Sequence, residues 1–435
     1  MSTLIRIKVA VLVIGGGIVG AIAADYFSEL GHSLLLLRVN DEGSPQADTL
    51  RNHGWWHTGP WYWLKWDKSP HLLTALRQWG REMLRRYKIT PAPGPAIFST
   101  DDPERARLFQ DKARQLRYPI KIYTEEEAKE LLCVPSIYNL GVQDRPFSPA
   151  NVIRMARNNA RRNGAQLRDL SVKDRVRLVR DPHSPSGFVI HAGGYVIEAG
   201  LTILSAGAGT PAMLEQLDLE HRISISRSIL IVTPSHHLWE TTVSGNMDTG
   251  LTIVRHDSDL SPTGSFEVIG GKGRVPIEGD IWTQRVPTAA EIEHLFKQFP
   301  AALLKEVEQA GYEVIAGLKT EALDEKSESQ AVPYVEVVDR DGIKNLVVAL
   351  PGKATFGLYT VHRVAQECGL AEGDYALDEK TGGSGSGGGQ PPSALPGKKW
   401  MAMPNMSWDI PRRNRQGGEA EATDNESDDS DKERG

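Results

Sequence analysis

A run of aliphatic residues near the start of the chain is followed by a glycine-rich turn. Residues 7–14 are mostly β-branched or aliphatic, which is typical of a parallel strand buried on both faces. Apolar residues then recur at helical spacing from Ile18 to Leu30, and Gly31 ends this pattern as a left-handed helix cap would. Residues 34–37 supply a second apolar strand. Strand, glycine turn, helix and strand within about thirty residues predict a dinucleotide-binding βαβ unit.

The same patterns predict further elements along the body of the chain. Apolar residues at helical spacing indicate helices at 70–88, 124–132, 149–162 and 288–310, and another that begins after Thr355. Apolar or alternating stretches indicate strands at 172–180, 187–197, 201–204, 225–233, 251–255, 265–269 and 345–350. The stretches between 225 and 269 alternate, so we expect antiparallel strands of a second domain there. A chain of 435 residues is long enough to bury two cores.

The composition changes sharply after Asp374. Residues 381–397 are rich in Gly, Ser and Pro, and residues 416–435 are acidic and poor in apolar side chains. We therefore expect a flexible linker and a disordered tail over 379–435. Between them, residues 398–415 carry two tryptophans and three methionines among basic residues. This Trp/Met segment could bind a protein partner, dock onto the body of the chain, or remain disordered.

Charge and cysteine content exclude several classes of function. The acidic tail carries a net charge of −6, equal to that of the whole chain, so the remaining body is neutral and lacks the basic excess that nucleic-acid binding needs. Cys133 and Cys368 are far apart and lie in no Cys/His cluster, which argues against disulfides and a bound metal. The run Val9 to Ile14 is too short to span a membrane. We expect a soluble, cytoplasmic protein that binds neither nucleic acid nor a membrane.

The glycine turn carries the first chemical signal. Gly15, Gly17 and Gly20 complete a G-x-G-x-x-G pattern, in which glycines allow a tight turn, close approach to a pyrophosphate, and close packing of helix on strand. The following helix would direct its free N–H groups and positive dipole end at the phosphates. A purely structural turn is the alternative, and the strand and helix on either side favour the cofactor site.

The end of the second strand departs from this pattern. An Asp or Glu normally stands there, about twenty residues beyond the glycines, and hydrogen-bonds the adenosine ribose. Arg38 occupies this position. It could leave the ribose to Asn40, Asp41 or backbone groups, it could bind the 2′-phosphate of NADP, or it could be a solvated arginine. We rank the altered ribose contact first and NADP second.

Several motifs together resemble one enzyme family. They are the opening βαβ unit, the loop 50–59, Ser148-Pro149-Ala150-Asn151 before a helix that ends at Asn163-Gly164-Ala165, Ser205-Ala206-Gly207-Ala208-Gly209, and Gly352-Lys353-Ala354-Thr355. In this order, residues 7 to about 370 resemble the FAD-dependent oxidoreductases related to D-amino-acid oxidase, glycine oxidase and 2-hydroxyglutarate dehydrogenase. The resemblance implies that FAD is the cofactor.

The resemblance also implies cofactor contacts. Gly15, Gly17 and Gly20 would hold the FAD pyrophosphate, Arg51, Asn52, His53 and Gly54 would run along the ribityl chain and flavin, Val172 would contact the adenine, and Ala206 and Gly207 would let the backbone pass close to the cofactor. Gly352, Lys353 and Thr355 would face the pyrimidine end of the flavin. Reduced flavin is negative near N1, which a lysine and a helix dipole would stabilise. An ordinary strand-to-helix turn is the alternative.

The substrate side rests on the same resemblance. Family members pair a substrate carboxylate with an arginine of the antiparallel domain, and Arg255 and Arg274 are the candidates, with a surface arginine as the alternative for each. His57 resembles the histidine that hydroxy-acid members place near the flavin, where it could accept a hydroxyl proton. It could equally be a packing residue. Half of the tryptophans lie at 55–66, where they could line a pocket for an apolar or aromatic substrate or belong to the core.

We therefore predict an α/β protein with a discontinuous Rossmann-like FAD-binding domain and a mainly antiparallel α+β substrate domain. The FAD domain is expected at 1–90, 146–222 and 340–378, and the substrate domain at 91–145 and 223–339. The expected reaction removes a hydride from the CH–NH or CH–OH carbon of a small amino or hydroxy acid. Two alternatives are an NADP(H)-dependent oxidoreductase that uses Arg38, and a degenerate flavin fold that acts as a binding or assembly component.

Overall fold

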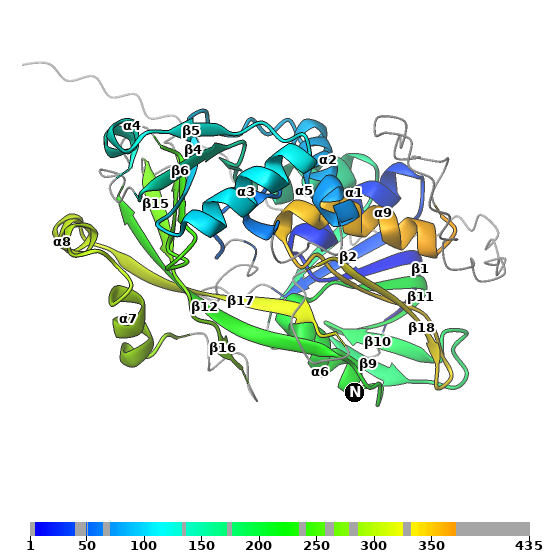
Figure 1. Ribbon diagram of the computed structural model, residues 1–435. Helices are drawn as coiled ribbons and strands as arrows, with labels where there is room; N and C mark the ends of the chain where they lie inside the picture. The colour runs from blue at the N-terminus through cyan, green and yellow to red at the C-terminus, as the bar shows by residue number, and fades with distance from the viewer. Residues whose placement is uncertain are drawn as a thin grey trace, which may run out of the picture. The chain divides into compact units, whose positions relative to one another are not determined.

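The computed structural model describes residues 5–39, 49, 51–63, 70–132, 136–171, 176–234, 241–256, 265–277, 286–324 and 332–370. Within these ranges the chain forms two large sheets (Figure 1) and a short ladder between β3 (Trp55–Trp56) and β7 (Arg145–Pro146). Several residues singled out in the sequence lie outside the described ranges: Asn40, Asp41, Trp66, Cys133, Val172 and the segment 379–435.

The first sheet is mostly parallel. Its strands follow the order β18-β19-β11-β1-β2-β8, and those from β19 to β8 run parallel to one another. The strands are β1 (Ile5–Ile14), β2 (Leu34–Val39), β8 (Gln166–Leu170), β11 (Tyr195–Leu204), β18 (Tyr334–Arg340) and β19 (Ile343–Leu350). On the side of β11, β10 (Phe188–Ala192) pairs antiparallel with it and with β9 (Arg177–Arg180).

The apolar second half of the first strand, Val9 to Ile14, reflects burial on both faces of the sheet, which is complete for its last four residues. Val11 and Val13 pack in the core formed with α1 (Ile18–Glu29), α5 (Pro149–Arg162) and α9 (Gly357–Glu367), to which α2 (Pro70–Arg86) also contributes. Leu12 and Ile14 pack on the opposite face, with residues of β9 and β10. Because successive side chains of a strand point to opposite faces, a strand without polar positions needs two cores.

The second sheet is mainly antiparallel. Its order is β16-β12-β15-β14-β13-β4-β6-β5, with β17 paired to β12, and β13 runs parallel to β4. The strands are β4 (Ala96–Thr100), β5 (Lys121–Tyr123), β6 (Tyr138–Val142), β12 (Ile223–Pro234), β13 (Val243–Asn246), β14 (Thr252–His256), β15 (Phe266–Gly270), β16 (Val275–Pro276) and β17 (Glu313–Ala322).

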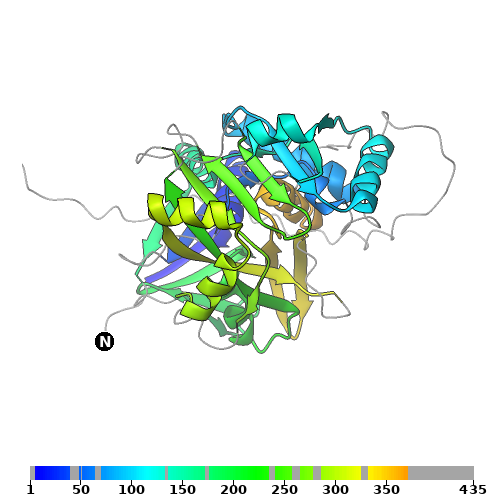
Figure 2. The same ribbon diagram turned by 60° about the vertical axis from the view of Figure 1, so that its left-hand side comes forward.

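Helices pack against the second sheet at several places. α7 (Ala289–Phe296) and α8 (Ala301–Ala310) lie beside the second sheet (Figure 2). Their side chains Leu295, Leu303 and Val307 pack with Ile253 of β14 and Ile269 of β15. At β4 the sheet meets α3 (Pro103–Gln115), and α4 (Glu125–Leu131) lies beside β5 and β6.

The structure corrects two expected elements. The predicted single helix over 288–310 is two helices, because Pro300 removes a backbone donor and α8 begins directly after it. The predicted strand over 187–197 is two strands joined at Gly193 and Gly194, both of which have positive φ (54° and 82°) that favours glycine. In addition β18, which the proposed boundary at 340 assigns to the substrate domain, pairs with β19 in the first sheet.

The described residues were compared with the requirements for a membrane-spanning helix and for a metal site. None of their helices is long and apolar enough to cross a membrane. The same residues contain no group of three or more His, Cys, Asp or Glu side chains that could hold a metal ion.

Candidate functional site

The glycine turn at the carboxyl end of β1 is closely packed. Gly15 has φ of +117°, and a Cβ atom there would lie 2.2 Å from the carbonyl oxygen of Ser205. A Cβ atom at Gly20 would lie 1.8 Å from the carbonyl oxygen of Gly15. Because neither backbone atom can move away cheaply, only glycine fits at both positions. The turn therefore holds β1, β11 and α1 in contact.

Three neighbouring parallel strands lead into helices whose N-cap residues provide no side-chain hydrogen bond, although Oγ1 of Thr49 accepts from the backbone of Ile18 in α1 at 3.4 Å. α1 follows β1, α6 (Thr210–Glu215) follows β11 through the 3₁₀ turn η4 (Gly207–Gly209), and α9 follows β19 through η7 (Ala354–Phe356). The N-cap residues of α3, α4, α5 and α7, by contrast, each cap their helix with a side chain. The N–H groups at these three starts are thus directed to the carboxyl edge of the sheet, where α/β proteins bind dinucleotides.

Arg38 lies against this glycine turn. A Cβ atom at Gly16 would be 2.2 Å from Cδ of Arg38, so the aliphatic stem of the arginine covers that glycine. Its guanidinium group donates to both carboxylate oxygens of Asp169 on β8, at 2.8 and 2.7 Å. The strand-end arginine is therefore fixed by an ion pair with the neighbouring strand.

The second sheet approaches the same edge through β17. Leu318 of β17 packs on Ala208 of η4, and Arg51 donates from Nη1 to the carbonyl oxygen of Ala316 at 3.2 Å. A Cβ atom at Gly317 would lie 2.2 Å from the carbonyl oxygen of Arg51. The loop that begins at Arg51 is thus fixed against β17.

His53 and His256 fix the next part of this loop. Nε2 of His256 lies 2.7 Å from the carbonyl oxygen of His53, to which it donates. The ring of His53 lies 3.2 Å from the hydroxyl of Thr252 and directly over Gly270. Burial, followed by the positive charge of Lys319, holds the pKa of His53 well below its usual range, so its imidazole is neutral. In the same loop Gly54 has φ of +61°, and the side chain of Asn52 accepts from the backbone of His53.

His57 occupies a buried position between a carboxylate and a phenol. Its Nε2 lies 3.3 Å from the hydroxyl of Tyr62, and its Nδ1 lies 3.7 Å from the carboxylate of Asp144. Asp144 is fully buried and accepts from Nε1 of Trp55 at 2.8 Å and from the backbone and hydroxyl of Thr58. The carboxylate favours the tautomer with a proton on Nδ1, which leaves Nε2 to accept from the Tyr62 hydroxyl.

The protonation states in this group follow from its burial. Burial lowers the pKa of His57 to about 4, although the hydrogen bond and charge of Asp144 oppose the shift. Burial raises the pKa of Tyr62, and the nearby Arg274 partly opposes this. At neutral pH the pair is therefore an uncharged imidazole and an uncharged phenol.

Three charged residues surround Tyr62. Nζ of Lys353, at the start of η7, lies 5.3 Å from the centroid of its ring. Arg274 donates from Nη1 to the carboxylate of Glu321 at 2.5 Å, and the charges of both residues act on the Tyr62 hydroxyl. Glu321 is 2% exposed and Arg274 is 35% exposed at the side chain. The buried carboxylate therefore positions an arginine that is accessible from solvent.

The structure separates the two candidate arginines. On β14, His256 faces the loop at Gly54, so its neighbour Arg255 points to the opposite face of the sheet. Ile253 shares that opposite face and packs with α7 and α8. The charge of Arg274 acts on Tyr62, which neighbours His57 and Lys353, whereas Arg255 lies on the face that packs with α7 and α8.

The tryptophan-rich loop is largely part of a core. Trp63 is 1% exposed and packs on Phe109 and Tyr118, with ring centroids 4.6 and 5.1 Å apart. Trp55 lies over His57 with ring centroids 4.0 Å apart. Trp56 and Trp61 are half-buried. Trp55 and Trp63 of the loop are therefore core residues, and Trp55 packs directly on His57.

Sequence reasoning missed four residues of these clusters: Tyr62, Asp144, Asp169 and Glu321. Tyr62 lies within the aromatic loop, in the 3₁₀ turn η2 (Pro60–Tyr62), among tryptophans that give the stronger sequence signal. Asp144 follows the apolar strand β6 and precedes Arg145-Pro146, and a lone acid between strands is a weak signal for burial. Asp169 and Glu321 need the strand register to show their partners.

Comparisons with known proteins agree with this architecture. The family model for FAD-dependent oxidoreductases (DAO) matches residues 10–350. The structure is similar to that of glycine oxidase from Geobacillus kaustophilus, with 18% identity and a TM-score of 0.66 over 85% of this chain and 97% of that one. It is similar to iminodiacetate oxidase from Chelativorans sp. BNC1, with 18% identity and a TM-score of 0.67 over 85% and 97%.

L-proline dehydrogenase from P. horikoshii shares the fold at 13% identity, with a TM-score of 0.62 over 86% of this chain and 96% of that one. At such identities the solved structures establish a common fold. The sequence comparison with curated proteins finds no match.

Proposed function

Because the chain belongs to the family of FAD-dependent oxidoreductases, we propose that it oxidises a small amino or hydroxy acid at its CH–NH or CH–OH carbon. FAD is the cofactor of this family and supplies the acceptor for the hydride. One observation supports the proposal most. Tyr62 contacts His57 and lies near Lys353, and the charge of Arg274 acts on its hydroxyl. This group lies beside the loop and the turn that would hold the flavin.

The residues at the carboxyl edge fit a dinucleotide. Gly15, Gly17 and Gly20 would hold the pyrophosphate at the uncapped start of α1, where a Cβ atom at the first or last of them would meet backbone. Ala206 and Gly207 would allow close passage at the second uncapped start.

The flavin end would rest on the remaining two segments. The loop of Arg51, Asn52, His53 and Gly54 would run beside the ribityl chain, because it is fixed at this edge by β17 and His256. Gly352, Lys353 and Thr355 would face the pyrimidine end. The buried hydroxyl of Thr355 makes no hydrogen bond within the described residues, which suits a group that awaits a ligand.

Arg274 would bind the substrate carboxylate. A guanidinium group presents five donors in a planar fork, and Glu321 engages Nη1 from a buried position. This support would hold the fork in place while it pairs with the acid, so that the reacting carbon is oriented by a charge-assisted contact.

His57 would accept the proton that leaves the substrate hydroxyl or amine. Its neutral imidazole has Asp144 on the Nδ1 side and Tyr62 on the Nε2 side, so a proton gained at Nε2 would be stabilised by the carboxylate. Half-buried Trp56 and Trp61 offer apolar surface, which supports a substrate with an apolar or aromatic side chain.

Anaerobic titration tests the proposed reaction. The purified protein is mixed, without oxygen, with a panel of amino and hydroxy acids and with the amines and alcohols that lack only their carboxylate. We expect an acid to bleach the flavin absorbance and its decarboxylated counterpart to react far more slowly. Failure of every acid in the panel would sink the proposal.

A pair of arginine variants tests the carboxylate contact. Arg274→Lys should raise the KM for a reactive acid about 10- to 100-fold, since a hydrogen bond to a charged group is worth roughly 1.5–3 kcal/mol. Arg105→Lys is the matched control, because Arg105 has a similar exposure (34%) and a similar ion pair with Asp248 at 2.6 Å. Equal KM values in the two variants would contradict the role of Arg274.

A further inference from the structure

The adenosine end of the cofactor site has an altered strand end. In dinucleotide-binding βαβ units the second strand ends in an acid that accepts hydrogen bonds from the ribose. Here the penultimate residue of β2 is Arg38, whose stem covers Gly16 of the glycine turn. A residue that lies on the turn itself occupies the place from which the usual acid would act.

A carboxylate stands one strand further along. Asp169 on β8 is the direct register partner of Arg38, and neighbouring strands are about 4.8 Å apart. Its two oxygens accept from Nε and Nη2 of Arg38 at 2.8 and 2.7 Å. The side chain of Asp169 remains 43% exposed. An accessible carboxylate is thus held at the edge by the arginine that replaced the usual acid.

A second arginine supports the same carboxylate. Arg157 of α5 donates from Nη2 to Asp169 at 3.3 and 3.5 Å, and its side chain is 12% exposed. Although burial opposes it, the hydrogen bonds and charges of Arg38 and Arg157 lower the pKa of Asp169. The carboxylate therefore stays ionised and able to accept hydrogen bonds.

We propose that Asp169, positioned by Arg38 and Arg157, is the group that binds the adenosine ribose hydroxyls of FAD in this chain. The ribose-binding carboxylate is thus supplied by β8, where the usual site has it on β2. Arg38 contacts both this carboxylate and Gly16 of the glycine turn. The proposal concerns the cofactor and is independent of the substrate proposed above.

The arrangement disfavours a phosphate at this place. Asp169 occupies the Nε and Nη2 side of the Arg38 guanidinium, so a 2′-phosphate could approach only the Nη1 end, beside the bound carboxylate. The exposed carboxylate would also repel a second anion. A neutral diol, which donates its hydroxyl hydrogens, suits an ionised carboxylate.

Cofactor binding to the apoprotein tests the proposal without any substrate. FAD, its 2′-deoxyadenosine analogue and FMN are titrated by flavin fluorescence into the full-length wild type and into Asp169→Asn. The wild type should bind FAD about 10- to 100-fold more tightly than the deoxy analogue, which is the worth of a hydrogen bond to a charged group. In Asp169→Asn this preference should fall to within about threefold, with FMN affinity unchanged.

Asp218→Asn is the matched control, because Asp218 also pairs with an arginine, Arg180, but lies 84% exposed at the side chain and away from the glycine turn. It should keep the wild-type preference. An unchanged preference in Asp169→Asn would overturn the proposal, as would an equal loss of FAD and FMN affinity, which would indicate a purely structural role. Tighter competition by 2′,5′-ADP than by ADP would also overturn it, in favour of a phosphate site.

A second variant covers the case in which Asp169→Asn fails to fold. In the double variant Arg38→Glu/Asp169→Asn, position 38 on β2 bears the carboxylate in place of position 169 on β8, and Arg157 remains as its positively charged neighbour. We expect this protein to prefer FAD over the deoxy analogue, because a carboxylate again stands beside the turn. Loss of the preference in this folded double variant would count against the proposal.

Discussion

The hydroxyl of Tyr62 lies 3.3 Å from Nε2 of His57, and both residues are buried. The carboxylate of Asp144 stands on the other side of the imidazole. Because Asp144 is anchored by Trp55 and Thr58, its carboxylate is held on the Nδ1 side of the histidine ring and favours a proton on that nitrogen. Burial thus keeps the imidazole of His57 neutral, with the phenol of Tyr62 beside Nε2 and the carboxylate of Asp144 on the side of Nδ1.

Replacing the imidazole tests its proposed role. His57→Gln should slow the anaerobic reduction of the flavin by about 10²-fold or more, because a positioned acid or base contributes on that scale. Stopped-flow absorbance with a reactive acid measures this rate. His32→Gln is the control, since His32 is half-buried, packs near Phe27, and lies beyond the end of α1 that is opposite to the glycine turn. Wild-type rates in His57→Gln would leave the histidine with a packing role.

The low pKa of His57 predicts how stability changes with pH. The unfolded chain takes up this proton near pH 6.5, whereas the folded protein takes it up only near pH 4. The contribution to stability is therefore complete above pH 6.5 and is lost as the pH falls towards 4, by about 3 kcal/mol in total. Urea unfolding at pH 7 and pH 5 should show a smaller fall for His57→Gln than for the wild type. Parallel pH profiles would contradict the assignment.

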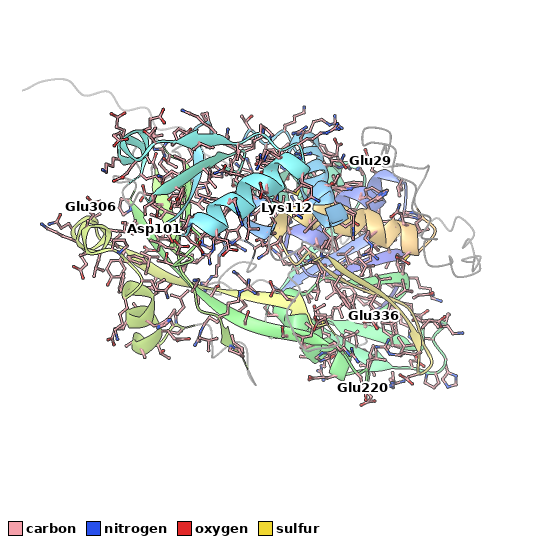
Figure 3. All side chains as sticks on the ribbon, viewed as in Figure 1. Glu29, Asp101, Lys112, Glu220, Glu306 and Glu336 are labelled. Atoms are coloured by element: carbon pink, nitrogen blue, oxygen red, sulfur yellow. The ribbon has the colours of Figure 1, made fainter. Side chains whose placement is uncertain are left out.

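A buried ion pair predicts a large loss of stability. Asp25 of α1 is 1% exposed and accepts from Arg86 at 3.0 and 3.1 Å and from the hydroxyl of Tyr87 at 2.9 Å. Asp25→Ala should cost about 3 kcal/mol or more, because the partners lose their acceptor. Glu29, labelled in Figure 3, also pairs with Arg86 but is 58% exposed, so Glu29→Ala should cost less than about 1 kcal/mol. Thermal unfolding compares the two, and similar losses would refute the distinction.

The glycine turn predicts a steric effect on cofactor binding. In Gly20→Ala the new methyl group would lie 1.8 Å from the carbonyl oxygen of Gly15, so the turn must open and FAD affinity should fall by at least about tenfold. Gly31→Ala is the control: its positive φ of 82° also strains a new side chain, but Gly31 lies beyond the opposite end of α1, and its Cβ atom would meet nothing within 4 Å. Fluorescence titration of the two apoproteins measures the difference. Equal affinities would show that the turn tolerates a side chain.

The sequence predicted the first sheet better than the second. β1, β2 and β19 are apolar runs buried on both faces, and a short apolar run that leads into a turn is typical of such a central strand. The strands β4, β5, β6 and β17 went unpredicted, because short or half-buried strands lack that pattern. Their places are determined by partners far away in the sequence.

The site shows the same division. The glycine turn could be predicted from the sequence because three residues at fixed spacing must all lack a side chain for the turn to pack closely. The pairing of Arg274 with Glu321, or of Arg38 with Asp169, depends on which strands lie side by side, and this register cannot be obtained from local sequence. The family resemblance supplied Arg255 and Arg274 as equal candidates, and only strand alternation separates them.

The three uncapped helix starts come from distant parts of the chain, near residues 17, 209 and 356. During synthesis the glycine turn emerges first, but its neighbours on β11 and β19 follow only after most of the body has been made. The complete carboxyl edge can therefore exist only late in synthesis, once the segment near residue 356 has been made and β19 has paired with β11.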